Sequence, residues 1–180
     1  RDDLPAAVEE LLDRGGAQAK YDVTPDLTTF GKVIGGGLPI GAVGGRREVM
    51  ETLSPLGPVF HAGTLSGNPL ATAAGLAALD QLEPDVYIEL LARARHLAAV
   101  LREACAAADF PAQFPVVGTL VGIVCGEVPP PVDFDGARRT DEAAYAGFFR
   151  AMLAGGVAMA PGAYEAIFVG LGHDDAVLDD

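Results

Sequence analysis

The chain has 180 residues, half of them hydrophobic and 21% charged, a composition typical of one folded domain, or a small domain plus part of another. Its 12 basic and 25 acidic residues give a net charge of −13. This charge argues against nucleic acid or an anionic membrane as a partner, because both require a basic surface. With no apolar stretch near the roughly 18 residues of a membrane span and no signal peptide, the sequence predicts a soluble, cytoplasmic protein.

The first half of the chain combines helical signals with glycine-rich turns. Asn68-Pro69 is a strong helix start, because asparagine caps the free amides and proline fits the first turn. The run from 33 to 45 mixes glycine with β-branched residues, which predicts tight turns and strands whose backbone approaches another group closely. The elements expected in order are a helix over 1–14 ended by Gly15-Gly16, a loop over 24–32, the glycine-rich run, a short helix over 46–53 and a helix over 69–82.

The second half follows a more regular pattern. Apolar residues at three- and four-residue steps predict a long helix after Pro84, and the composition shift there predicts a domain boundary. The elements expected in order are a helix over 86–108, strands within 114–125, a proline-rich loop over 128–134, a helix capped by Thr140 and running to about 153, strands over 157–159 and 167–171, and the start of a helix in the acidic tail. Helices and strands in this order indicate an α+β layer.

Lys32 has an unusual sequence setting. It follows a threonine-rich loop and precedes an apolar, glycine-rich segment, with no acidic residue within three positions. A lysine held in apolar surroundings loses solvation, which favours the neutral amine that attacks an aldehyde to form a Schiff base. On spacing alone a surface lysine remains the alternative. The sequence does not match the P-loop pattern, because Asp26 stands where that pattern requires glycine. It does not match the dinucleotide-binding pattern either, because Ile40 stands where that pattern requires glycine.

Two further segments are candidate sites. In the segment 62–69, Thr64 and Ser66 stand among glycines just before a helix start, a pattern that can bind a phosphate dianion, although it can also be an ordinary capped helix. Glu165 lies between two predicted strands and is either a site carboxylate or a surface one. The three histidines and two cysteines show no metal-ligand spacing, and Cys105 and Cys125 read as buried free thiols.

Four segments taken in order resemble class III aminotransferases, and most closely the glutamate-1-semialdehyde 2,1-aminomutases of that family. They are residues 24–32, 34–47, 62–69 and 160–166. The resemblance covers about residues 15–180 and implies an α/β fold, the type I fold of pyridoxal-phosphate (PLP) enzymes. It implies that residues 1–84 are part of the PLP-binding large domain and that residues 85–180 are a C-terminal α+β small domain cut short at its end.

The resemblance also implies roles for the candidate residues. Lys32 would hold PLP as a Schiff base and move the proton, with the cofactor passing through its pyridoxamine form. Gly63 and Thr64 would bind the phosphate of the cofactor in the other subunit of a homodimer. Glu165 would lie near the substrate, whereas Arg46 and Arg47 are not assigned as a substrate clamp.

Residues 1–14 depart from the family pattern. The family has an apolar strand ending in Asp-Glu just before the position of Gly15, and its aspartate pairs with the pyridine nitrogen of PLP. Here a polar helix stands instead, similar to a family helix that normally lies several dozen residues earlier. We therefore expect that the sequence is joined at Arg14–Gly15 with an internal stretch and the N-terminal part absent.

The reaction that the resemblance implies is the isomerisation of glutamate-1-semialdehyde to 5-aminolevulinate for tetrapyrrole synthesis. Its substrate is a small amino aldehyde, and Lys32 would be the base in each proton shift. Two alternatives stay open. One is another class III aminotransferase that uses a different amine donor, and the other is a catalytically inactive fragment that acts only as a dimerising unit.

Overall fold

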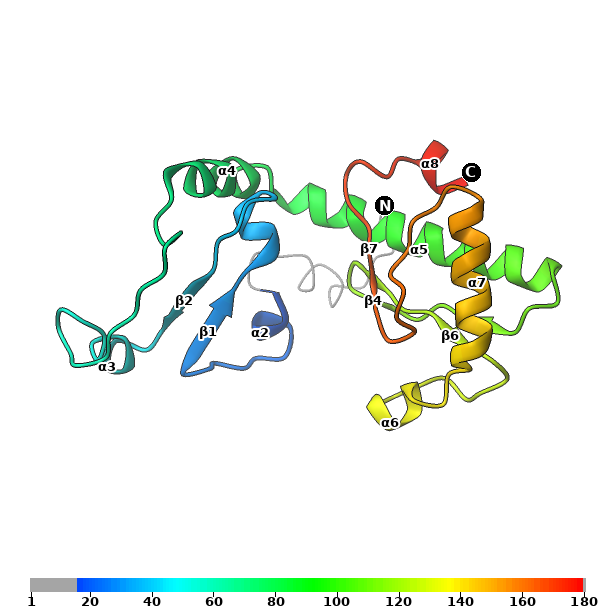
Figure 1. Cartoon of the computed structure of the whole chain (residues 1–180), viewed down its shortest axis with the longest axis horizontal. Coiled ribbons are helices and arrows are strands. Elements are labelled where there is room, and N and C mark those ends of the chain that lie inside the picture. The colour runs from blue at the N-terminus through cyan, green and yellow to red at the C-terminus, as the bar shows by residue number, and fades with distance from the viewer. Residues whose placement is uncertain (1–15, 180) are drawn as a thin grey trace. The chain divides into compact units, whose positions relative to one another are not determined.

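The computed structural model describes residues 16–179, which belong to two compact units, Arg1–Val86 and Tyr87–Asp180 (Figure 1). The helix predicted over 1–14 and the junction predicted at Arg14–Gly15 lie outside the described residues. None of the helices within 16–179 is both long enough and apolar enough to cross a membrane.

The first unit contains a two-stranded sheet and several short helices. Its elements are α2 (Gly16–Lys20), β1 (Leu27–Phe30), the 3₁₀ helix η2 (Lys32–Gly35), β2 (Ala42–Gly45), α3 (Arg47–Met50) and α4 (Pro69–Leu79). Strands β1 and β2 are antiparallel, with Leu27 opposite Gly45 and Phe30 opposite Ala42. The loop predicted over 24–32 is therefore wrong at 27–30, because its threonines and leucine suit a strand once the glycine-rich run supplies a partner. Gly16 begins the unpredicted helix α2.

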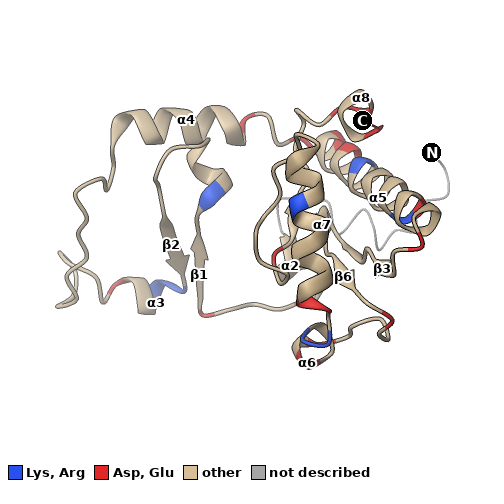
Figure 2. Ribbon diagram, turned by 45° about the vertical axis from the view of Figure 1, so that its right-hand side comes forward, with Lys and Arg blue, Asp and Glu red and all other residues tan. Residues whose placement is uncertain are grey.

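Helix α4 begins as predicted. The Asn68 side chain accepts hydrogen bonds from the amides of Leu70 (3.0 Å) and Ala71 (3.1 Å), and Pro69 is the first helical residue. The helix ends at Leu79, three residues earlier than expected. It carries no charged side chain, as the uniform tan ribbon of Figure 2 shows.

Helix α4 packs against η2 so closely that only glycine fits on both sides. A Cβ on Gly36 would lie 2.5 Å from the carbonyl oxygen of Ala74, and one on Gly75 would lie 2.2 Å from the carbonyl oxygen of Ile34. Gly36 also has a φ of +56°, a left-handed conformation that glycine adopts at little cost. The close backbone approach predicted for the glycine-rich run is confirmed here.

The second unit is built on the long helix α5 (Pro84–Ala107), within two residues of its predicted bounds. The other elements are β3 (Ala112–Gln113), β4 (Val116–Val117), β5 (Leu120–Val121), β6 (Val124–Cys125), α6 (Phe134–Ala137), α7 (Glu142–Ala154), β7 (Ile167–Phe168) and α8 (Asp175–Asp179). Strand β3 pairs with β6, and β4, β5 and β7 form a second antiparallel sheet. The strand predicted at 157–159 is not formed, and α6 was not predicted.

The core of this unit lies between α5, α7 and the short strands. Small side chains of α5, Ala94 and Ala98, are almost fully buried, and Val121 and Cys125 are completely buried. Alanine takes the most buried positions of α5, because its small side chain lets the helix approach its neighbours closely. Both cysteines are free and buried, as predicted.

Thr140 was wrongly predicted as the cap of α7. Asp141 caps the helix instead, accepting from the amides of Ala143 (3.0 Å) and Ala144 (2.9 Å). Thr140 is buried, and its hydroxyl accepts a hydrogen bond from the amide of Cys125 at 2.9 Å. Its role is to tie the start of α7 to β6.

Two helical glycines give a matched test of the α4–η2 contact. Gly75→Ala should lower the free energy of unfolding by about 1–3 kcal/mol, because the new Cβ would meet the Ile34 carbonyl. Gly147→Ala in α7 should raise it by about 0.5–1 kcal/mol, because nothing lies within 4 Å and alanine favours the helix. Urea denaturation of the two variants measures both values, and equal effects would contradict the packing described.

The Cys125 thiol predicts a pH dependence of stability. Burial raises its pKa to about 11 from the ordinary 9.0, with Cys105 and Asp141 adding smaller effects. The folded protein therefore holds a proton that the unfolded chain releases, so this contribution is complete below pH 9 and is lost as the pH rises towards about 11. Thermal melts should show that Cys125→Ala loses less Tm than the wild type over this window. If Tm falls equally steeply with pH in Cys125→Ala and in the wild type, the thiol does not make this contribution.

Candidate functional site

Lys32 is the first residue of η2 and has an unusual backbone conformation. Its φ of +54° lies in the left-handed region, which costs a non-glycine residue on the order of 1 kcal/mol. A left-handed backbone at a residue other than glycine is a form of strain that often occurs at functional sites. Lys32 borders a hollow of about 560 Å³ together with Val33, Gly37, Leu38 and Pro39. Lys32 and Lys20 are the two lysines in the sequence.

The Lys32 amine is exposed rather than enclosed. The described residues do not themselves supply the apolar cover predicted for it, because its apolar neighbours are open to solvent. Phe30 is 51% exposed and Val33 is 63% exposed. Among residues 16–179, Lys32 makes no ion pair or side-chain hydrogen bond, so its amine is available to a ligand.

The loop before α4 forms a second hollow. It measures about 630 Å³ and is lined by Pro39, Ile40, Gly41, His61 and the loop residues 63–67. The loop is a tight turn, in which the Ser66 amide donates to the Gly63 carbonyl at 3.0 Å and Gly67 has a φ of +66°. A Cβ on Gly63 would lie 2.9 Å from the Ser66 hydroxyl oxygen, so glycine keeps that hydroxyl uncovered.

The donors of this loop differ in part from those predicted. Asn68 already occupies the amides of Leu70 and Ala71, so the first free amides of α4 are not available to a phosphate. The hydroxyls of Thr64 and Ser66 make no hydrogen bond within the described part of the chain, and neither do the amides of Thr64 and Leu65. Hydroxyls and amides that face one hollow near a helix N-terminus suit a phosphate dianion.

The structure does not bring all the predicted site residues into one pocket. Lys32 lines one hollow, Gly63 and Thr64 line the other, and Pro39 borders both. Sequence reasoning did not identify Pro39, which stands shortly after a glycine-rich turn. Glu165 lies in the second unit, in the segment between α7 and β7, with its side chain exposed.

The two arginines after β2 are engaged locally. Arg46 pairs with Asp26 at 2.9 Å and also with Glu48, so its guanidinium joins the segment before β1 to the end of β2. Arg47 pairs with Glu51 at 3.6 Å along α3. Both side chains therefore have structural partners. This agrees with the sequence analysis, which did not assign either arginine to hold the substrate.

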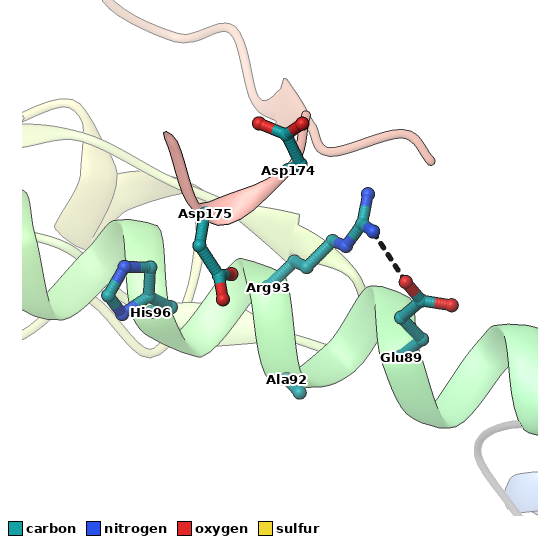
Figure 3. Close-up of a pocket in the computed structure, with 6 residues that line it drawn as sticks. All are labelled: Glu89, Ala92, Arg93, His96, Asp174 and Asp175. Atoms are coloured by element: carbon teal, nitrogen blue, oxygen red, sulfur yellow. Dashed lines mark hydrogen bonds and ion pairs between the residues drawn. The ribbon is translucent and has the colours of Figure 1, made fainter. Parts of the chain in front are cut away.

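A third hollow, in the second unit, is lined mostly by charged side chains, of which Arg93 and Glu89 pair with each other (Figure 3). Arg93 donates to the Leu171 carbonyl and to Glu89, both at 2.5 Å, and His96 contacts Asp179 at 2.6 Å. These contacts hold the C-terminal segment against α5. The sequence analysis missed Arg93, because nothing in its spacing indicates a partner 78 residues later. Residues 16–179 contain no cluster of metal-ligating side chains.

Comparison with known proteins places these features in a family. The model of the family "Aminotransferase class-III" matches residues 13–162. Glutamate-1-semialdehyde 2,1-aminomutase of Desulfosudis oleivorans is 48% identical over 166 residues, which are 92% of this chain and 39% of that protein. The corresponding protein of Syntrophobacter fumaroxidans is 49% identical over 171 residues, or 93% of this chain and 39% of that protein. The chain thus spans about two fifths of the length of these relatives.

Solved structures show the same fold. An omega-transaminase from Sphaerobacter thermophilus matches with a TM-score of 0.79 and 32% identity, covering 97% of this chain and 41% of that one. A glutamate-1-semialdehyde aminomutase from Pseudomonas aeruginosa in complex with PMP matches with a TM-score of 0.74, covering 93% of this chain and 39% of that one. At 20% identity the second match shows the fold alone. The chain has part of the mixed α/β class III fold, and it belongs to the class III aminotransferase family.

Proposed function

We propose that this chain is part of a glutamate-1-semialdehyde 2,1-aminomutase, an enzyme that isomerises glutamate-1-semialdehyde to 5-aminolevulinate. The observation that carries the proposal is the 48% identity to the Desulfosudis oleivorans aminomutase across 92% of this chain. Because the chain spans 39% of that protein, the activity belongs to the whole enzyme of which these residues are a part.

The division of the chain supports the domain assignment. In this proposal residues 1–84 are part of the PLP-binding large domain of the type I fold, and residues 85–180 form most of the small α+β domain. The two compact units meet in sequence between Val86 and Tyr87, two residues after the proposed boundary.

The residues of the first unit fit the PLP on which the family depends. When bound, PLP supplies an electron-withdrawing ring that stabilises negative charge on the substrate carbon next to the amine. Lys32 would hold the cofactor through its amine and would carry protons to and from that carbon. Its unpaired amine, its hollow and its left-handed backbone support this role.

The loop before α4 is proposed to bind the cofactor phosphate of a second subunit. The Thr64 hydroxyl and the amides of Thr64 and Leu65 would donate to phosphate oxygens, and the N-terminus of α4 adds a favourable dipole. Gly63 and Thr64 face a different hollow from Lys32, which supports a phosphate that belongs to another subunit's cofactor.

The apolar surface of the first unit supports burial by further protein. Helix α4 is apolar on every side, a pattern typical of a buried helix, yet Leu70 is 73% exposed and Leu76 is 57% exposed. Phe60 is 81% exposed and Leu56 is 77% exposed. We propose that the rest of the large domain and a second subunit cover these side chains, and that this cover desolvates Lys32 and encloses the small amino aldehyde substrate near Glu165.

A second candidate within the family is an aminotransferase that takes its amino group from a separate donor. The 32% identity to the Sphaerobacter thermophilus omega-transaminase favours it. Product analysis separates the two, since an aminomutase needs no added amine donor or acceptor. The aminomutase remains the better-supported function because the identity to it is higher.

The two lysines give a matched test of the cofactor role. Lys32→Ala in the whole enzyme should lower kcat by at least about 10³-fold, because it removes both the covalent anchor and the base. Lys20→Ala should leave kcat within about twofold of the wild type, since no role is assigned to that lysine. Steady-state production of 5-aminolevulinate measures both. Equal losses in the two variants would contradict the assignment.

Substitutions at Thr64 test the phosphate site. Thr64→Val keeps the shape but removes the hydroxyl, so it should raise the Kd for PLP by about tenfold, as expected for one hydrogen bond to a charged group. Thr64→Ser keeps the hydroxyl and should restore affinity to near the wild-type value. Titration of the PLP-free apoenzyme with PLP, followed by absorbance, gives the affinities. Equal affinity for all three proteins would remove Thr64 from the site.

A further inference from the structure

The segment that carries Glu165 is attached to α7 at two points. The Tyr145 hydroxyl donates to the Ala160 carbonyl at 2.6 Å, and the Tyr164 hydroxyl donates to the Glu142 carboxylate at 2.6 Å. Glu142 and Tyr145 are three residues apart and therefore lie on the same face of α7. One face of this helix thus holds the segment both at its beginning and directly before Glu165.

The inner attachment is part of the core. Tyr145 is 3% exposed, and its ring lies 6.5 Å from that of Phe148, measured between ring centres. Burial raises the pKa of the Tyr145 hydroxyl, which keeps it protonated as a donor. Breaking its bond to Ala160 would leave a polar group without a partner in the interior, so this end of the segment is firmly fixed.

The outer attachment lies at the surface and depends on Glu142. Tyr164 is 49% exposed, and its ring also contacts Phe134 at a centre-to-centre distance of 6.3 Å. The hydrogen bond to Glu142 raises the pKa of the Tyr164 hydroxyl, so the donor stays protonated at neutral pH. A carboxylate acceptor makes this bond stronger than one to a neutral group.

A turn that begins at Gly162, between these attachments, ends at Glu165, directly after the outer one. The Glu165 amide donates to the Gly162 carbonyl at 3.2 Å. A Cβ on Gly162 would lie 3.3 Å from Cγ of Glu165, so the glutamate side chain lies against the bare backbone of that glycine. Glu165 is also near enough to Tyr145 to contribute to the rise in the pKa of that tyrosine.

We propose that Glu142, Tyr145 and Tyr164 are positioning residues that hold the Glu165 carboxylate in place for the substrate. The inference rests on the proposed function, in which Glu165 lies near the substrate. The sequence named Glu165 but gave no reason to connect it with Glu142, which lies 22 residues before Tyr164. Two hydrogen bonds to a single helix face leave the intervening turn little freedom, and fixed geometry of this kind is what a substrate contact requires.

The test uses the whole enzyme with Tyr164→Phe, which removes the donor of the outer attachment, and Glu142→Gln, which weakens the attachment by replacing the carboxylate acceptor with a neutral amide oxygen. Tyr87→Phe and Glu103→Gln are matched controls, because neither side chain has a hydrogen bond or ion pair among the described residues. Tyr164→Phe should lower kcat/KM on the order of tenfold, mainly by raising KM, and Glu142→Gln should lower it by less, whereas the controls should not change it. In a Glu165→Ala background, Tyr164→Phe should have no further effect, because it acts through that carboxylate.

Hydrogen exchange of residues 160–166 provides a readout that does not depend on activity. Exchange there should be faster in Tyr164→Phe and Glu142→Gln than in the controls. Faster exchange with an unchanged kcat/KM would overturn the positioning role. So would a Tyr164→Phe substitution that lowers kcat/KM by the same factor in the wild-type and Glu165→Ala backgrounds. A wild-type enzyme that produces no 5-aminolevulinate would instead contradict the proposed function, and unchanged exchange in the variants would contradict the attachment itself.

Discussion

The first unit depends on one close backbone contact, between η2 and α4. Gly36 and Gly75 remove the side chains that would separate the 3₁₀ turn from the helix. Lys32 begins that turn, and the Thr64 loop leads into that helix. The same contact therefore positions the turn that begins with the lysine and the helix that follows the phosphate loop, and it requires glycine at both positions. A larger residue at either position would separate the two parts of the proposed site.

Sequence reasoning succeeded where the signal was local. Asn68-Pro69 carries its own cap, and the bounds of α5 follow from its proline start and its apolar period. It failed where a distant partner decides the outcome. Residues 27–30 become a strand because residues 42–45 pair with them. Thr140 looked like a cap, but Asp141 is better placed, and the threonine hydroxyl serves the Cys125 amide instead.

The candidate site shows the same limit. The residues around Lys32 are apolar, as read from the sequence, but apolar neighbours in sequence do not by themselves cover a side chain. Phe30 and Val33 are more than half exposed. The desolvation that makes a lysine reactive must come from protein beyond these residues, a role that the proposal gives to the rest of the large domain and a second subunit. The second unit contributes differently, since α7 holds the Glu165 segment by contacts within the unit.

The central claim is that Lys32 is the residue that holds PLP. Borohydride reduction makes the bond between a lysine and PLP permanent, and mass spectrometry of the digested enzyme then identifies the modified peptide. The account predicts one modified peptide, containing Lys32, in the enzyme reduced after incubation with PLP. Modification of Lys20, or of a lysine elsewhere in the whole enzyme while Lys32 stays free, would contradict it.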